Sequence, residues 1–205
     1  MRNNTRQRIL EVSLELFSQK GFSAVSIRDI CGRVQIKEST LYYYFRNKQA
    51  VFDELVSLFE KKAEEMMKRL EEGLNGGIFP SNGNFYRNVC DAFFENYLMD
   101  DFCNKVMRLL QIEQYGNEKV REIYDCWMFE KPLAFQGKVF RMLMEAGVIA
   151  KSDSVYLAVK YYAPISMFAR RWLFAGELTE EKKGMFRREA YYHIERFFAE
   201  IKAGE

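Results

Sequence analysis

The fold is decided by residues 26–48, which read SIRDICGRVQIKESTLYYYFRNK. Ser26 stands three residues before Asp29, which is the spacing of a capping box at the start of a helix. Apolar residues then recur at three- and four-residue spacing as far as Val34, the pattern of one buried helix face. The stretch therefore begins with a short helix.

A second short helix is predicted around Leu41 and Phe45, which lie four residues apart after a connector at residues 35–37. A longer helix comes before both, because residues 9–17 carry an apolar stripe, and Thr5 is its expected N-cap. Three helices with a tight turn between the second and third are the layout of a helix-turn-helix unit.

The third helix of this unit has an outward face of hydroxyl, phenol and charged groups. Such groups suit phosphate oxygens and the edges of bases. We expect at least one of the three tyrosines to pack inward instead. The residues at this face are Lys37, Glu38, Ser39, Thr40, Tyr42, Tyr43 and Tyr44.

Charge is unevenly divided along a chain of 205 residues whose net charge is only +2. Residues 1–48 contain nine Lys or Arg and four acids, whereas the other 157 residues contain 22 basic and 25 acidic side chains. A basic end favours nucleic-acid binding, because Lys and Arg release the counterions that condense on phosphates. A solvated basic helix face explains the charge equally well, so the pattern of residues has to decide.

The composition excludes several classes of protein. Hydrophobic residues make up 48% of the chain and aromatic residues 16%, enough for a large core. No apolar run approaches the roughly 20 residues of a membrane-spanning helix, and no signal peptide is evident, so we expect a cytoplasmic protein without a membrane partner. The four cysteines lack a C-x-x-C pair, which favours buried, reduced thiols over a metal site or disulfides.

The rest of the chain predicts helices and no strands or repeats, so the fold class is all-α. A long helix follows Lys48, and the glycine-rich residues 73–83 form a loop. Pro132 and Pro164 lie inside predicted helices, where each lacks the amide for the carbonyl four residues earlier, and should bend or break them. The further helices are expected at residues 85–99, 102–115, 118–146, 153–175 and 180–202.

The sequence gives no support to an enzyme. It lacks a P-loop, G-x-G-x-x-G, G-x-S-x-G and H-E-x-x-H motif. Its single histidine, His193, is expected at the surface or in a dimer contact. We therefore predict no catalytic residues, no metal site and no cofactor.

The first 48 residues contain the pattern Thr5-x-x-x-Ile9-Leu10, Leu16-Phe17, Gly21-Phe22, Ser26-Ile27-x-x-Ile30 and Thr40-Leu41-Tyr42-x-Tyr44-Phe45-x-Asn47-Lys48. With this pattern, residues 5 to about 55 resemble the DNA-binding part of the TetR family of bacterial transcriptional regulators. The resemblance implies residues 1–48 as a helix-turn-helix DNA-binding domain and residues 49–205 as a larger helical domain for ligand binding and dimerisation.

With this resemblance, the expected partner is double-stranded DNA. Phosphate and arm contacts are assigned to Arg6, Ser26, Tyr44 and Lys48. Arg28 lies at the start of the second helix, and the expected base-reading residues, at or near bases, are Lys37, Ser39, Thr40, Tyr42 and Tyr43.

One turn departs from the family pattern. The family usually has a small-residue turn of the type Ala-Gly-Val-Ser, whereas residues 34–37 read Val-Gln-Ile-Lys. Gln35 therefore has to accept the backbone angles that glycine normally takes, with strain if φ is positive. Lys37 in place of serine removes a cap from the third helix.

The second domain is rich in methionine and aromatic residues, which are typical either of ordinary core packing or of an apolar ligand cavity. In the TetR family this domain usually binds a small inducer between its middle helices, and the last two helices form a dimer bundle. The resemblance therefore implies a homodimeric repressor released from a pseudo-palindromic operator by a small apolar or aromatic ligand of unknown identity. The candidate ligand contacts are Phe93, Tyr97, Met107, Trp127, Met128 and Phe168.

Two alternatives stay open at this point. The second domain of a constitutive DNA-binding regulator would only dimerise, and it would enclose no cavity of ligand size. A helical interaction module or an enzyme without a DNA function would fail to bind DNA tightly even at low salt, where electrostatic attraction is strongest.

Overall fold

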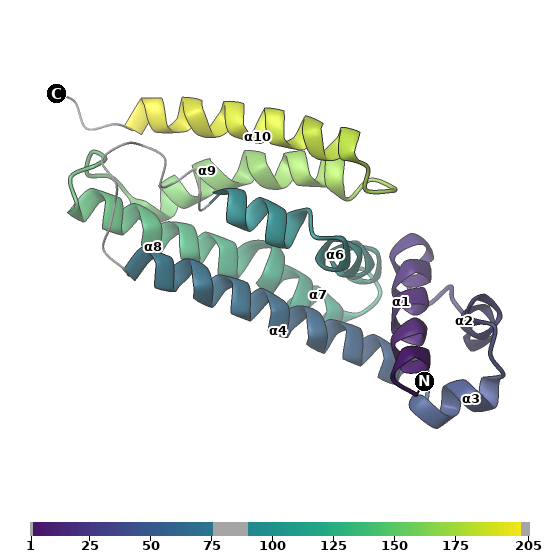
Figure 1. Cartoon of the computed structure of the whole chain (residues 1–205). Helices are drawn as coiled ribbons and strands as arrows, with labels where there is room; N and C mark the ends of the chain where they lie inside the picture. The colour runs from purple at the N-terminus through teal and green to yellow at the C-terminus, as the bar shows by residue number, and fades with distance from the viewer. Residues whose placement is uncertain (1, 76–89, 202–205) are drawn as a thin grey trace. The chain divides into compact units, whose positions relative to one another are not determined.

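The computed structural model describes residues 2–75 and 90–201, and within these two stretches the regular elements are helices, without a strand (Figure 1). The all-α prediction is therefore confirmed. The chain divides into two compact units, residues 1–121 and 122–205. The functional division into residues 1–48 and 49–205 stays a prediction, because compactness alone groups the first helices with those that follow them.

The first unit begins with α1 (Arg2–Lys20), α2 (Ile27–Val34) and α3 (Glu38–Tyr44), followed by the long α4 (Lys48–Asn75). Residues 90–93 are helical and continue into the π-helical segment η1 (Phe94–Leu98), after which comes α6 (Asp101–Glu113). Helix α1 packs on α2, α4 and α6, and α4 also packs on α6 and η1. Helix α6 therefore touches both α1 and α4.

The second unit begins within α7 (Glu118–Asp125). It consists of the π-helical η2 (Cys126–Glu130), α8 (Lys131–Glu145), α9 (Ser154–Phe168), the π-helical η3 (Ala169–Leu173) and α10 (Glu180–Ile201). Helix α9 packs on α8 and on α10, and the three run side by side (Figure 1). The helices predicted at 102–115, 118–146, 153–175 and 180–202 agree with these elements to within two residues.

Two helix ends differ from prediction. Helix α1 begins at Arg2, so Thr5 lies inside the helix and is not its N-cap. Helix α4 continues through Gly73 to Asn75, although residues 73–83 were expected to form a loop. The rest of that loop and residues 85–89 of the next predicted helix lie outside the described residues.

The prolines of the second unit stand beside π-helical segments. Pro132 lies in the first turn of α8, directly after η2, whereas α9 passes through Pro164 without a break and then continues as η3. A proline at residue 132 cannot donate to the carbonyl of Met128. The hydroxyl of Tyr162 donates to that carbonyl oxygen at 2.9 Å. The tyrosine of α9 therefore supplies a hydrogen bond that the helix itself cannot make.

Tyr162 is suited to this role because its side chain is buried. Burial raises the pKa of its phenol, and the nearby phenol of Tyr124 adds to the effect. The hydroxyl therefore stays protonated and remains a donor at any physiological pH.

The cysteines behave largely as the sequence predicts. Cys31, Cys90 and Cys103 are buried, and Cys126 is half-buried. Burial, followed by the charge of Asp100, raises the pKa of Cys103 to about 12, so this thiol is protonated at neutral pH.

None of the described helices combines the length and the apolar character that crossing a lipid bilayer requires.

Replacement of Tyr162 by Phe should lower the free energy of unfolding by about 1–3 kcal/mol, because the buried Met128 carbonyl loses a donor while the ring packing is kept. Urea unfolding followed by circular dichroism measures the change. Tyr115→Phe is the matched control, since the Tyr115 side chain is 84% exposed, and should shift stability by less than about 0.5 kcal/mol. Equal unfolding midpoints for the two variants would show that the Tyr162 hydrogen bond contributes nothing.

Candidate nucleic-acid interface

The first three helices are held together by a small apolar core. Ile9 and Phe17 of α1, Ile30 of α2 and Leu41 of α3 are buried, as the predicted stripes require. Because Leu41 is buried, the opposite side of the short α3 faces solvent. The core therefore fixes which side chains of α3 are available to a partner.

Helix α2 starts with the predicted capping box. The Ser26 hydroxyl accepts from the amide of Asp29 at 3.1 Å, and the Asp29 carboxylate accepts from the amide of Ser26 at 2.8 Å. The Ser26 hydroxyl also donates to this carboxylate, and this contact is the largest reason that the pKa of Asp29 is lowered. Ser26 thus fixes the start of α2 with the same hydroxyl that was predicted to contact phosphate.

The turn between α2 and α3 is strained at one residue. Gln35 has φ 62° and ψ 48°, the left-handed region that favours glycine, as expected from its place in the family's turn. Lys37 occupies the N-cap of α3 and makes no side-chain cap hydrogen bond. Both departures from the family pattern therefore have the predicted local effect on the backbone.

The outward face of α3 contains Ser39, Tyr42 and Tyr43, at the i, i+3 and i+4 spacing of one helix face. All three are exposed, Tyr42 to 50% and Tyr43 to 67%. Thr40 and Tyr44 are half-buried, and the Tyr43 and Tyr44 rings meet edge to face with centroids 5.1 Å apart. Ser39, Tyr42 and Tyr43, together with Lys37, are therefore the exposed members of the predicted base-reading set, whose contacts with DNA stay a prediction.

The predicted cations differ in availability. The Arg28 side chain is 87% exposed, although its Nε lies 3.3 Å from a carboxylate oxygen of Glu38. Lys37, the N-cap of α3, is exposed as well. Arg6 pairs with Glu54 of α4 and lies over the ring of Phe45.

Lys48 is engaged inside the protein. Its Nζ donates to the backbone oxygens of Phe22 at 2.7 Å and Val25 at 2.6 Å, and it lies 4.2 Å from the Phe22 ring centroid. The ammonium thereby fixes the segment before α2. Arg46, exposed directly after α3, is a further cation that sequence reasoning did not single out beyond its charge.

Helix α6 is attached to the first helices by polar contacts. The Glu113 carboxylate accepts from the Ser23 hydroxyl at 3.0 Å and the Ser23 amide at 3.4 Å, and Lys105 pairs with Glu15 of α1 at 2.8 Å. Gly21 lies in this contact with φ 84°, and a Cβ there would come within 2.5 Å of Glu113 Oε1. A glycine at this position therefore lets α6 reach the loop after α1.

The candidate ligand residues fall into both units. In the first, the Tyr97 hydroxyl lies 3.9 Å from the sulfur of Met107, and the rings of Phe93 and Tyr97 have centroids 5.3 Å apart. In the second, Trp127 and Met128 are buried and Phe168 is half-buried. Their role as ligand contacts stays a prediction.

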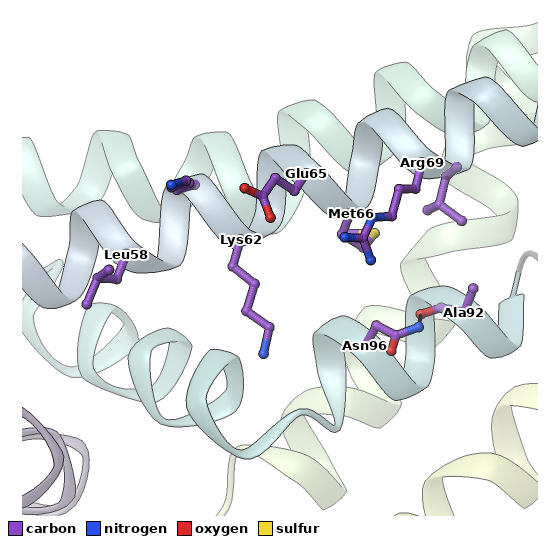
Figure 2. Close-up of a pocket in the computed structure, with 9 residues that line it drawn as sticks. Leu58, Lys62, Glu65, Met66, Arg69, Ala92 and Asn96 are labelled. Atoms are coloured by element: carbon purple, nitrogen blue, oxygen red, sulfur yellow. Dashed lines mark hydrogen bonds between the residues drawn. The ribbon is translucent and has the colours of Figure 1, made fainter. Parts of the chain in front are cut away.

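A pocket of about 640 Å³ lies in the first unit between α4 and the helix formed by residues 90–98 (Figure 2). Its described lining contains none of the six predicted ligand residues. The sequence signal that could have found it is the recurrence of lining residues every three or four positions from Leu58 to Leu70, which places them on one face of α4. Among the described residues, no cluster of three His, Cys, Asp or Glu side chains could hold a metal ion.

Residues 9–55 match the family model described as bacterial regulatory proteins, tetR family. The HTH-type transcriptional regulator AcrR of Shigella flexneri is 37% identical over 62 residues, which cover 30% of this chain and 29% of AcrR. The uncharacterized HTH-type regulator YerO of Bacillus subtilis (strain 168) is 31% identical over 74 residues, which cover 36% of this chain and 26% of YerO. The chain thus spans less than a third of the length of these two relatives.

Solved structures extend the likeness to the whole fold. A TetR-family transcriptional regulator from Mesorhizobium loti MAFF303099 aligns with a TM-score of 0.68 at 19% identity, over 98% of both chains. SmeT, the repressor of a multidrug efflux pump of Stenotrophomonas maltophilia, aligns with a TM-score of 0.62 at 16% identity, over 97% of this chain and 90% of SmeT. Fold and motif define a helix-turn-helix regulatory protein. Within that class, residues 9–55 match the TetR family model, and the whole chain has the fold of solved TetR-family structures.

Replacement of Gln35 by Gly should raise the free energy of unfolding by about 0.5–1 kcal/mol. Glycine has no Cβ, so it avoids the cost of about 1–2 kcal/mol that the left-handed conformation of Gln35 imposes on the folded state. Glycine also raises the entropy of the unfolded chain, which cancels part of this gain. Chemical denaturation measures the gain. Gln35→Ala, which keeps the Cβ, is the control and should show no gain. A destabilising Gln35→Gly would mean that the glutamine side chain, and not its backbone, determines the turn.

Proposed function

We propose that this chain is a dimeric DNA-binding transcriptional regulator, a repressor that leaves a pseudo-palindromic operator when a small, largely apolar ligand binds. The observation that carries the proposal is the outward face of α3, where Ser39, Tyr42 and Tyr43 are exposed on a helix whose other side is buried through Leu41. A helix of this kind inserts into the major groove and contacts base edges.

The cations around α3 supply the sequence-independent part of the binding. Arg28, Lys37 and Arg46 are exposed next to α2 and α3, and each phosphate that they neutralise releases counterions. Arg6 and Lys48 support this surface indirectly, because their contacts with Glu54 and with the carbonyls of Phe22 and Val25 hold the helices in place. Ser26, Tyr44 and Thr40 complete the predicted contact set, with Ser26 presenting the amino-terminal end of α2 to a phosphate.

A second copy of the chain is the expected partner of α9 and α10. An exposed apolar stripe along α9 contains Val155, Tyr156, Val159 and Met167, and α10 adds the exposed Tyr192. Apolar surface of this kind typically marks a protein interface. A two-fold dimer also suits DNA, since it presents two short reading helices to half-sites about one helical turn apart.

Ligand release follows from the contacts of α6 within the first unit. Helix α6 contacts the loop between α1 and α2 through Glu113, and it contacts α1 through Lys105. A ligand that shifts α6 therefore also shifts the elements that position α2 and α3. By reciprocal linkage, such a ligand binds the DNA-free protein more tightly than the DNA-bound protein. The repressor SmeT, which shares the fold, is a precedent for repression by a protein of this fold.

Replacement of Tyr42 by Ala should weaken binding to the preferred DNA site by about tenfold or more per half-site, because a base contact contributes about 1–3 kcal/mol of discrimination. The preferred site is first selected from random duplexes with the full-length protein, and fluorescence anisotropy then measures affinity. Tyr115→Ala is the control, since Tyr115 is 84% exposed but lies after α6. Absence of any selected site at low salt, or equal behaviour of the two variants, contradicts a reading role for α3.

Replacement of Val159 by Asp should convert a dimer into monomers, because a charge placed in an apolar interface loses its hydration without gaining a partner. Sedimentation equilibrium measures the mass. Ile112→Asp, an equivalent change at an exposed apolar residue of α6, should leave the dimer intact. A wild-type protein that sediments as a monomer at micromolar concentration contradicts the dimer.

A further inference from the structure

The pocket beside α4 has a floor and a rim of different character. Its floor is a row of residues four apart on α4, namely Leu58, Lys62, Met66 and Leu70, of which Met66 and Leu70 are buried. Figure 2 shows Met66 and Arg69 directed from α4 toward the helix of Ala92 and Asn96, whereas Lys62 reaches Asp100 at the start of α6. The distance from Lys62 to Leu70 along the helix axis is about 12 Å, at 1.5 Å per residue.

The rim and floor together are positively charged. Lys61, Lys62 and Arg69 face a single carboxylate, that of Glu65. Within the described part of the chain, Lys61 and Arg69 make no ion pair, and both are exposed. With Asp100 also counted, because it pairs with Lys62, an excess of one positive charge lies beside the buried Met66 and Leu70. A pocket of this character is complementary to an anion that carries an apolar chain.

Lys62 already holds a carboxylate. Its Nζ lies 2.7 Å from Oδ2 of Asp100 and 6.0 Å from the centroid of the Phe102 ring. Asp100 is the N-cap of α6, and its other oxygen accepts from the amide of Cys103 at 2.9 Å. Burial alone would raise the pKa of Asp100, but the hydrogen bonds from Lys62 and Cys103 outweigh it and lower the pKa. Asp100 is therefore ionised and competes for the lysine.

We propose that the α4 pocket binds a long-chain carboxylate. Its head group forms an ion pair with Lys62 in place of Asp100, and its chain lies along Met66 and Leu70 toward Ala92. The carboxylate is chosen because Lys62 accommodates that group already, and Lys61 beside it adds a second cation. The exchange detaches α4 from the start of α6, the helix whose other end contacts the Ser23 loop. This inference rests on the proposed function, since it names the ligand class of the regulator.

Binding of dodecanoate to the full-length protein, measured by calorimetry below its micelle concentration, tests the proposal. Dodecanoate should bind at least tenfold more tightly than dodecyltrimethylammonium, which has the same chain and the opposite charge. Decanoate should bind about tenfold more weakly than dodecanoate, because each buried methylene contributes about a three- to fourfold change. Dodecyl phosphate that binds as well as dodecanoate would overturn the choice of a carboxylate.

Substitutions locate the site. Lys62→Gln should weaken dodecanoate by about tenfold, and Lys62→Arg should restore most of the affinity. Lys68→Gln on the same helix, outside the pocket lining, is the matched control and should change nothing. Asp100→Asn keeps an N-cap residue but removes the competing charge, so it should tighten binding. Ala92→Phe should block the pocket, and circular dichroism verifies that each variant is folded.

The outcomes separate this inference from the proposed function. Equal binding of the two oppositely charged amphiphiles, no binding of dodecanoate, or equal effects of Lys62→Gln and Lys68→Gln overturn the carboxylate site, even if the protein binds its selected DNA. Loss of all DNA binding at low salt, with dodecanoate still dependent on Lys62, overturns the regulator and leaves the site standing.

Discussion

The position of α3 depends on how the loop after α1 is fixed to α4. The ring of Phe22 meets Phe17 of α1 and Phe52 of α4 edge to face, with centroids 5.4 Å and 5.1 Å away. Lys48, at the start of α4, lies over the same ring and donates to the carbonyls of Phe22 and Val25. Apolar packing and an ammonium thus fix one short loop. Because α2 begins directly after this loop, the outward direction of α3 follows from it.

Short-range features of this fold are readable from the sequence. The capping box of Ser26 and Asp29, the positive φ of Gln35 and the uncapped start of α3 at Lys37 each depend on residues within four positions of one another. Helix periodicity is equally local, which is why the helices of both units were predicted to within a few residues. The same logic assigned Leu41 to the core and Tyr42 and Tyr43 to the surface.

Contacts between residues that are far apart in the chain could not be predicted from the sequence. A lysine such as Lys48 has the same appearance in sequence whether it meets a phosphate or two carbonyls 23 and 26 residues away. The residues of α4 that form the pocket floor recur with helical spacing, so the sequence can reveal them. The residues that face them across the pocket, Ala92 and Asn96, come from a later helix, and local spacing does not predict this pairing. The Tyr162 hydroxyl that serves the Met128 carbonyl likewise comes from 34 residues away. Tertiary packing alone decides such pairs.

Helix α6 is held differently at its ends and along its length. Its apolar residues Cys103, Val106 and Leu109 are fully buried, and removing even one large buried side chain costs about 2–5 kcal/mol. Its ends are held by part-exposed polar contacts, such as Lys62 with Asp100, which are worth about 0–1 kcal/mol each. Coupling between two sites typically amounts to about 1–3 kcal/mol. Exchanging a few end contacts costs less than unpacking one buried side chain, so our proposal has a ligand move α6 as an intact helix and exchange its polar end contacts.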